Sequence, residues 1–299
     1  MSAGTQTVKT KATPTIMRAA TPEDADSCGR IFYDAFESIA TRHNHPVEAG
    51  SPEFTRFLVG QMLQNDGYAG LVAERGGEVL GSAFIDERSI IAGIGPVSVD
   101  PGAQDAGVGR ALMEAALERE REREREAAGV RLVQTAYHYR SLGLYLKLGF
   151  AVRETLSVVA GTPPAQSFPG LSVRPAEVND VSACGELCMR VHGHDRKGEL
   201  RDAIAAGSAR VVERPGRICG YATGFGYGWH AVAETNEDLT ALIASAEALM
   251  GLGVLVPSRN SELLRWCLEQ GLQIVQQSTL MTIGLYNEPE GAYLPSILF

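Results

Sequence analysis

Two glycines, Gly107 and Gly109, stand where the sequence predicts that a strand leads directly into a helix. Alternating apolar residues through Val97 and Val99 predict the strand, and the apolar positions of 111–116 predict the helix. The first N–H groups of a helix have no partner within it, and the helix dipole adds partial positive charge, so such a loop attracts an anion. Glycine also lets a phosphate approach where a Cβ would collide, although both glycines could simply shape the turn.

This loop does not fit the two common nucleotide motifs. A P-loop is excluded because no Gly-Lys-Ser/Thr follows the glycines. A dinucleotide fingerprint needs three glycines, and only two are present, with no early strand-turn-helix before them. The anion would therefore belong to another kind of ligand.

A second segment, Ser141–Phe150, carries Tyr145 on an apolar helix face. On such a face Tyr145 could be an ordinary core tyrosine.

Together, these segments resemble the GNAT N-acyltransferase superfamily. Gln104-Asp-Ala-Gly-Val-Gly109 matches the Gln/Arg-x-x-Gly-x-Gly/Ala loop of that family, and Ser141–Phe150 is similar to its Leu-Tyr-x-Lys-Leu-Gly-Phe signature. The resemblance covers residues 15–160 well and the remainder more faintly.

The resemblance implies that acetyl-CoA is the cosubstrate and that no metal is needed. Backbone groups of Val97 and Val99 would bind the pantetheine arm and polarise the thioester carbonyl. Tyr145 would protonate the departing thiolate. Backbone amides would cradle the pyrophosphate, and these belong to Gln104, Asp105, Ala106, Gly107, Val108, Gly109 and Arg110.

The sequence departs from the family pattern at three positions. Seven residues before the tyrosine the family often has Asn, and here His138 takes its place. The strand positions that frequently supply a Glu or His base are Gly93 and Gly95. The base is then a water chain, the acceptor amine itself or a group elsewhere, for which the candidates are Glu87 with its neighbour Asp86, followed by His43 and His45.

The first half predicts a mixed sheet with helices packed on its faces, an α/β (α+β) fold class, and the resemblance implies two tandem GNAT-like domains. Gly76-Gly77 predicts a hairpin turn, and Pro96 predicts a bulge because it lacks an amide donor. The expected strands are 15–20, 69–75, 79–86, 94–100, 131–136 and one from 150, and the expected helices are 23–42, 52–64, 107–128 and 141–148.

The second half begins like the first. Arg18, Asp24 and Cys28 recur at a constant spacing as Arg174, Asp180 and Cys184, which indicates duplication of a whole domain. Three prolines and two glycines in 161–170 predict a linker. We therefore expect a disordered leader at 1–14, a catalytic domain at 15–160, this linker, and a degenerate domain at 171–299.

The second copy lacks the chemistry of the first. Where the phosphate loop should lie, Thr235 or Asn236 predicts a helix cap followed by acidic residues that would repel a pyrophosphate. Cys267 stands opposite Tyr145. Residues 224–230 are candidates to line the acceptor cleft, or else form an aromatic strand edge, and we expect the apolar tail Tyr293–Phe299 to dock on a domain surface.

The composition excludes several other classes of protein. A formal charge of −9 argues against nucleic acid, and no apolar run is long enough for a membrane span. Five scattered cysteines favour the cytoplasm, and Cys184 and Cys188, one turn apart without a second ligand pair, favour ordinary buried thiols over a metal site. The alternating run Glu118–Glu126 is interpreted as a solvated helix extension, with a docking arm as the alternative.

These observations predict an acetyl-CoA-dependent N-acetyltransferase acting on an amine of a small molecule or peptide. The rival from another class is a non-catalytic acyl-CoA sensor. Oligomerisation is left open.

Overall fold

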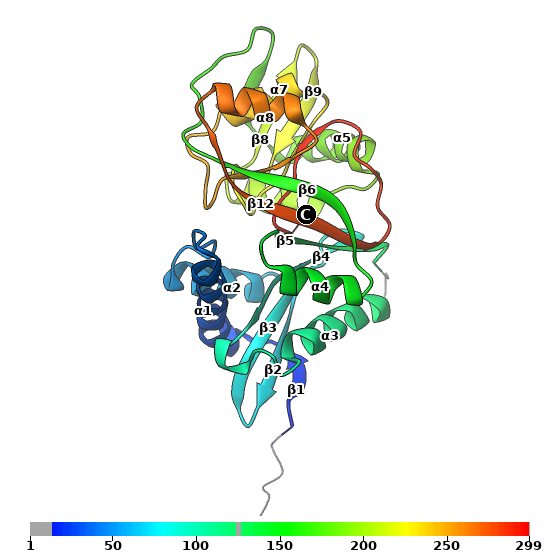
Figure 1. Cartoon of the computed structure of the whole chain (residues 1–299). Coiled ribbons are helices and arrows are strands. Elements are labelled where there is room, and N and C mark those ends of the chain that lie inside the picture. Colours follow the sequence, from blue (N-terminus) through cyan, green and yellow to red (C-terminus); the bar gives the residue numbers. More distant parts are fainter. Residues whose placement is uncertain (1–13, 124–126, 299) are drawn as a thin grey trace, which may run out of the picture.

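The computed structural model describes residues 14–123 and 127–298 (Figure 1). The predicted leader therefore lies almost wholly outside the described residues, as do Glu124–Glu126 of the alternating run. The first half comprises β1 (Ile16–Ala19), α1 (Ala25–His43), α2 (Pro52–Gln64), β2 (Tyr68–Arg75), β3 (Glu78–Asp86), β4 (Ile91–Val99), α3 (Val108–Glu122), β5 (Gly129–Thr135), α4 (Tyr139–Lys147) and β6 (Ala151–Ala160).

The second half repeats this order of elements and adds one strand. It comprises β7 (Ser172–Pro175), α5 (Val181–His192), α6 (Lys197–Ala205), β8 (Arg210–Arg214), β9 (Arg217–Ala222), β10 (Ala231–Ala233), α7 (Asn236–Ala244), β11 (Val254–Pro257), α8 (Ser261–Glu269), β12 (Gln273–Gly284) and β13 (Ala292–Leu294). The mixed α/β class expected from the sequence is confirmed, while α3 ends at Glu122 instead of reaching residue 128.

Matched residues make matched contacts in the two halves. Arg18 pairs with Asp24 at 2.7 Å, and Arg174 pairs with Asp180 at the same distance. In both cases the aspartate is the last residue of a short 3₁₀ turn, and its carboxylate also accepts the backbone N–H of the residue just before that turn. The repeated residues therefore join the first strand of each half to the following helix.

The two halves exchange strands in the middle of the molecule. The larger sheet has the order β1-β2-β3-β4-β5-β12-β6-β11, so β12 of the second half lies between β5 and β6 of the first. In turn, β6 lies between β12 and β11. Figure 1 shows β6 and β12 side by side between the two halves. The predicted linker, residues 161–170, lies between β6 and β7, and the division into domains at that point stays a prediction.

Strands β4 and β5 separate partway along their length. Their parallel pairing runs from Ile91 to Gly93 on β4 and ends opposite Arg131 on β5. Beyond this point β4 continues beside β3, with a register shift opposite Gly95-Pro96, which confirms the bulge expected at Pro96. The β4–β5 fork, residues 95–99 and 132–135, opens between the two strands.

Different helices cover the two faces of this sheet. On one face α1 and α2 bury Phe32 and Val59 against Phe84 of β3. On the other, α3 and α4 pack on the sheet, with Met113 buried against Ile94 of β4. The fork therefore has an α1–α2 side and an α3–α4 side. Among the described residues, no helix is long and apolar enough to cross a bilayer.

Candidate functional site

The loop Asp100–Gly107 turns the chain from β4 into α3. The Asp100 side chain accepts the Gly102 N–H at 2.8 Å, and the Gln104 amide donates to the Val99 carbonyl at 3.2 Å. Gly107 adopts φ 81° immediately before α3 begins at Val108, a conformation that suits glycine. The loop therefore presents the first amides of α3 at the end of β4, beside the fork.

The glycines leave room at this helix start. A Cβ added to Gly107 would meet nothing within 4 Å, and one added to Gly109 would meet only Val99 Cγ2 at 3.4 Å. The protein itself therefore does not require glycine at 109 for packing. The absence of a side chain there leaves the loop amides open to a ligand.

An ion pair joins this loop to α4. Arg140 Nη2 lies 2.6 Å from Asp105 Oδ1, and both side chains are at least half exposed. Asp105 itself has φ 66°, in the left-handed region. The guanidinium thus stands next to the loop that the sequence predicts to hold an anion. The sequence analysis missed Arg140, which follows His138 by two residues at the start of α4.

Tyr145 lies on α4, facing the core of the α3–α4 side. Its ring contacts that of Phe150 edge-on at 5.9 Å, and it packs against the cluster around Met113 and Ile94. Burial raises the pKa of Tyr145 to about 12. The hydroxyl therefore holds its proton at neutral pH, as a general acid must.

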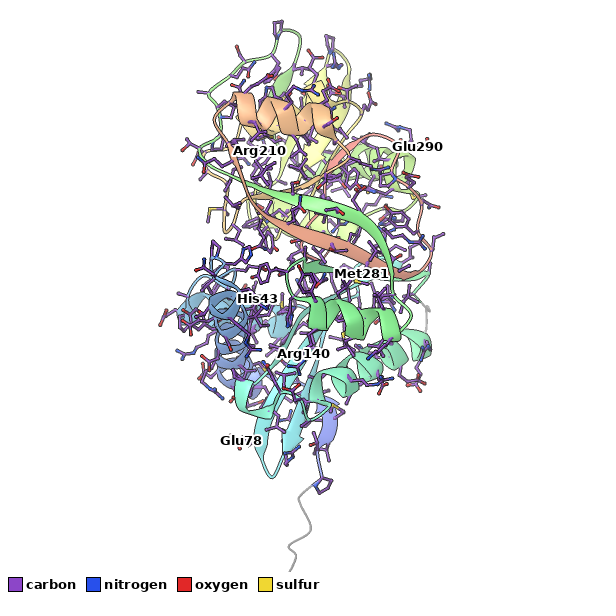
Figure 2. All side chains as sticks on the ribbon, in the orientation of Figure 1. His43, Glu78, Arg140, Arg210, Met281 and Glu290 are labelled. Atoms are coloured by element: carbon purple, nitrogen blue, oxygen red, sulfur yellow. The ribbon has the colours of Figure 1, made fainter. Side chains whose placement is uncertain are left out.

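His138 stands immediately before α4 and faces α1. Ser141 Oγ lies 2.6 Å from its Nδ1, and the His43 ring lies 6.4 Å away. Burial lowers the pKa of His138 to about 4, so its ring is neutral at physiological pH. Figure 2 labels His43, the last residue of α1, and Arg140, in the first turn of α4.

The two candidate imidazoles, His43 at the end of α1 and His45 in the α1–α2 connection, both contact Tyr137. The His45 ring stacks on Tyr137 at 4.0 Å, and the His43 ring lies 5.3 Å from it. Tyr137 follows the last residues of β5, so the structure brings His43, His45 and His138 together at the end of this strand.

Glu48, in the same connection, was also missed by the sequence analysis. Its Oε1 accepts hydrogen bonds from Thr135 Oγ1 at 2.7 Å and from Gln276 Nε2 at 2.5 Å. Its Oε2 accepts one from the Tyr227 hydroxyl at 3.2 Å. Thr135 closes β5, whereas Gln276 and Tyr227 come from the second half. One carboxylate therefore joins both halves beside the fork.

The two acidic residues proposed as a base are both held in ion pairs. Asp86 is buried and paired with Arg88. Glu87 binds Arg119 at 2.6 Å, and that residue lies ten positions beyond Gly109, about 15 Å along the helix axis. Burial opposes ionisation of Glu87, but the Arg119 guanidinium outweighs it and lowers the pKa of Glu87. A general base works best with a pKa near neutrality, so the ion pair with Arg119 disfavours Glu87 in that role.

The equivalent region of the second half has a different structure. Thr235 caps α7 by accepting the Asp238 N–H, and the buried Asp238 pairs with Arg214 at 2.9 Å. Cys267, opposite Tyr145 in the duplication, is fully buried. The predicted cap is confirmed, and carboxylates occupy the helix start where the first half has its glycine loop. Among the described residues, no cluster of His, Cys, Asp or Glu is arranged to hold a metal ion.

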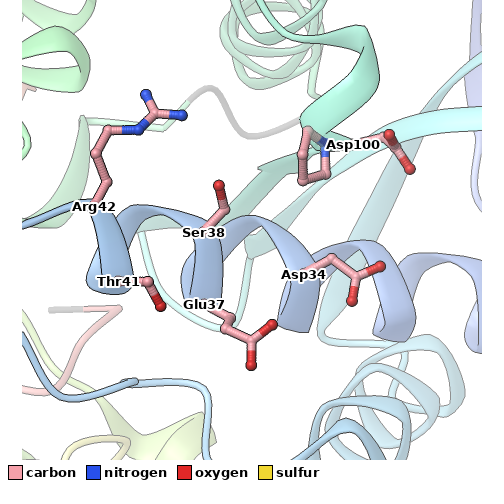
Figure 3. Close-up of a pocket in the computed structure, with 7 residues that line it drawn as sticks. Asp34, Glu37, Ser38, Thr41, Arg42 and Asp100 are labelled. Carbon is pink, nitrogen blue, oxygen red and sulfur yellow. The ribbon is translucent and has the colours of Figure 1, made fainter.

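A groove of about 640 Å³ runs between α1 and the start of the Asp100–Gly107 loop (Figure 3). Asp34 and Glu37 line it from α1, opposite Asp100 and Pro101, and Arg42 lies at one end. The groove opens on the α1–α2 side, next to the end of β4.

Comparisons with known proteins agree with this geometry. Residues 66–152, which include β4, the loop and Tyr145, match the sequence profile of the family described as acetyltransferase (GNAT) domain. No curated protein sequence gives a match.

Solved structures share the fold across nearly the whole chain. A candidate acetyltransferase from Pyrococcus horikoshii has a TM-score of 0.69 at 22% identity, with 97% of each chain covered. A GCN5-related N-acetyltransferase from Sphaerobacter thermophilus has a TM-score of 0.61 at 17% identity, covering 92% of this chain and 96% of that one. A tandem GNAT protein from the clavulanic acid biosynthesis pathway has a TM-score of 0.54 at 14% identity, covering 95% and 100%.

Proposed function

We propose that this chain is an acetyl-CoA-dependent N-acetyltransferase of the GNAT superfamily, because residues 66–152 match the GNAT acetyltransferase domain and the chain shares its fold with solved acetyltransferases and a tandem GNAT protein. The first half is the catalytic one. The observation that carries the proposal is the meeting of the glycine loop, the β4–β5 fork and the proton-bearing Tyr145 in one region of that half.

Acetyl-CoA would bind with its pyrophosphate on the amides of 104–110 and its pantetheine arm along β4. The space beside Gly109 supports this assignment, because only Val99 lies near the position of a Cβ. Arg140 would leave Asp105 and neutralise phosphate charge. Backbone groups of Val97 and Val99, at the open edge of β4, would bind the arm and polarise the thioester carbonyl.

The reaction is direct transfer. The acceptor nitrogen forms a bond to the thioester carbonyl carbon, and the carbon–sulfur bond breaks with its electron pair going to sulfur. The Tyr145 hydroxyl gives its proton to that thiolate. The acceptor amine gives its proton to solvent on the α1–α2 side of the fork, where His43 and His45 lie beside Tyr137, and the Tyr145 phenolate regains a proton from solvent.

The second half would serve the first without binding a cofactor of its own. The acidic start of α7 disfavours a pyrophosphate there. Tyr227 and Gln276 instead reach Glu48 of the first half. This supports a role in shaping the acceptor side of the catalytic half.

Two measurements test the function. Titration calorimetry with acetyl-CoA should give saturable binding, and a panel of amines screened with a free-thiol reagent should reveal turnover. Tyr145→Phe should abolish most turnover, with Tyr139→Phe as the matched control because Tyr139 is largely exposed. Absence of binding would refute the proposal, and binding without transfer to any amine would favour the acyl-CoA sensor.

A further inference from the structure

The segment Ser296–Leu298 of the second half reaches the β4–β5 fork of the first. The Ile297 N–H donates to the Tyr227 carbonyl at 2.8 Å. Leu298 packs against the cluster between α1, α2 and the sheet, which includes Phe84. The second half thus sends a side chain into the first half on its α1–α2 side.

Two glycines of β4 accommodate this segment. A Cβ on Gly93 would lie 2.3 Å from the Leu298 carbonyl oxygen, so no other residue fits there without moving the segment. A Cβ on Gly95 would lie 3.4 Å from Leu298 Cδ2. Gly93 is also the last β4 residue paired with β5. Leu298 therefore lies where the fork begins to open.

We propose that Leu298 is a specificity-determining residue that walls the acceptor site opposite β4; this rests on the proposed acetyl transfer. Gly93 and Gly95 lie at the start of the fork, where the proposed transfer places the acceptor amine. Here these positions carry no side chain, and the space beside them is bounded by Leu298. The second half therefore supplies, through Leu298, an apolar side chain at the position where β4 has only glycine.

Contacts with both halves of the chain fix the position of Leu298. Tyr227, which accepts the Ile297 N–H through its carbonyl, donates its hydroxyl to Glu48 beside the fork. Strand β13, which precedes the segment, pairs with β10 in the second sheet. Leu298 is thus fixed relative to both halves, and this allows one side chain to discriminate between acceptors.

A thiol placed at this position would report its distance from the acetyl group without knowledge of the acceptor. In Leu298→Cys, bromoacetyl-CoA would carry its reactive carbon to the position of the acetyl group. The thiolate sulfur would bond to that carbon, bromide would leave with its electron pair, and the thiol proton would go to solvent. The five native cysteines are all buried, so the background is low.

The matched control is Leu268→Cys, because Leu268 is 51% exposed on the last turn of α8 in the second half. Alkylation is followed by mass spectrometry of the intact chain. We expect Leu298→Cys to react at least about tenfold faster than Leu268→Cys, since a held reactant has a high effective concentration. Free CoA should suppress the reaction of Leu298→Cys and leave that of Leu268→Cys unchanged.

Equal alkylation rates in the two variants, while calorimetry still shows CoA binding, would contradict the proposed role of Leu298 without contradicting the proposed function. Loss of CoA binding in the unmodified protein would instead overturn the proposed function. A second pair of variants gives an independent readout: Leu298→Ala should raise kcat/KM for bulky amines relative to small ones, and Leu298→Trp should do the reverse. If the kcat/KM for bulky amines relative to small ones is unchanged in both variants, with acetyl-CoA affinity preserved, the proposed role of Leu298 is also contradicted.

Discussion

The guanidinium of Arg140 lies 2.6 Å from the carboxylate of Asp105 and ties the first turn of α4 to the loop before α3. The two residues carry opposite charges at the site proposed for a pyrophosphate, so they should affect acetyl-CoA binding in opposite directions. Asp105 repels the ligand, and Arg140 attracts it once released.

Removing the cation should weaken binding. We expect Arg140→Ala to raise the Kd for acetyl-CoA about tenfold, which corresponds to about 1.4 kcal/mol. Asp105→Asn should lower the Kd, since Asn keeps the left-handed backbone without the charge. Calorimetry at two salt concentrations checks both, with Arg121→Ala on exposed α3 surface as control. Equal Kd values in all variants would place the phosphate elsewhere.

Adding one methyl group to the loop should separate binding from stability. In Gly109→Ala the new Cβ fits the free protein, and alanine favours a helix over glycine by about 0.5–1 kcal/mol. The variant should therefore unfold at a slightly higher temperature yet bind acetyl-CoA at least about tenfold more weakly. Gly60→Ala on α2, where a Cβ meets nothing within 4 Å, should leave binding unchanged. Undiminished affinity of Gly109→Ala for acetyl-CoA would contradict the proposed binding of the pyrophosphate by the amides of 104–110.

The acid role of Tyr145 has a pH signature. Because burial raises its pKa to about 12, the hydroxyl keeps its proton up to about pH 11. We expect kcat to stay level from pH 8 to 10, and Tyr145→Phe to lower kcat about 10²-fold with little change in acetyl-CoA affinity. A pH–rate profile that falls with a midpoint near 10, the value of an exposed tyrosine, would contradict the assignment.

Three buried histidines should make stability depend on pH. Burial lowers the pKa of His192, of His194 to about 3 and of His230 to about 4. Because these pKa values lie below the unfolded value of about 6.5, the unfolded chain binds more protons as the pH falls. Stability is therefore fully present above pH 6.5 and is lost toward pH 4, by up to about 4 kcal/mol per pH unit for the three together.

Urea unfolding at pH 7.5, 6 and 5 measures this loss. His230→Gln should reduce the slope between pH 6 and 5 by up to about 1.4 kcal/mol per unit, because one proton uptake is removed. The exposed His43, replaced in the same way, serves as the control. An unchanged slope in His230→Gln would show that this imidazole takes up its proton in the folded state as well.

Local chemistry made the loop and its helix predictable. The glycine at 107, the cap at Thr235 and the bulge at Pro96 each follow from the conformations that single residue types allow. The repeated Arg–Asp pairs could be found because both members lie within six residues of each other in each half.

Contacts between distant segments could not be found in this way. Glu48 and Gln276 are separated by 228 positions, and no local pattern marks either as a partner. The same holds for Leu298 beside Gly93, where only the missing side chain on β4 is visible in the sequence. The ion pair of Glu87 with Arg119 was hidden for a related reason, since Arg119 lies on another element, 32 positions along the chain.

The insertion of β12 between β5 and β6 limits how this gene can change. A stop codon in the connection after β6 would leave β5 and β6 with unpaired edges in the middle of the catalytic half. The larger sheet is therefore complete only when both halves of the chain are present.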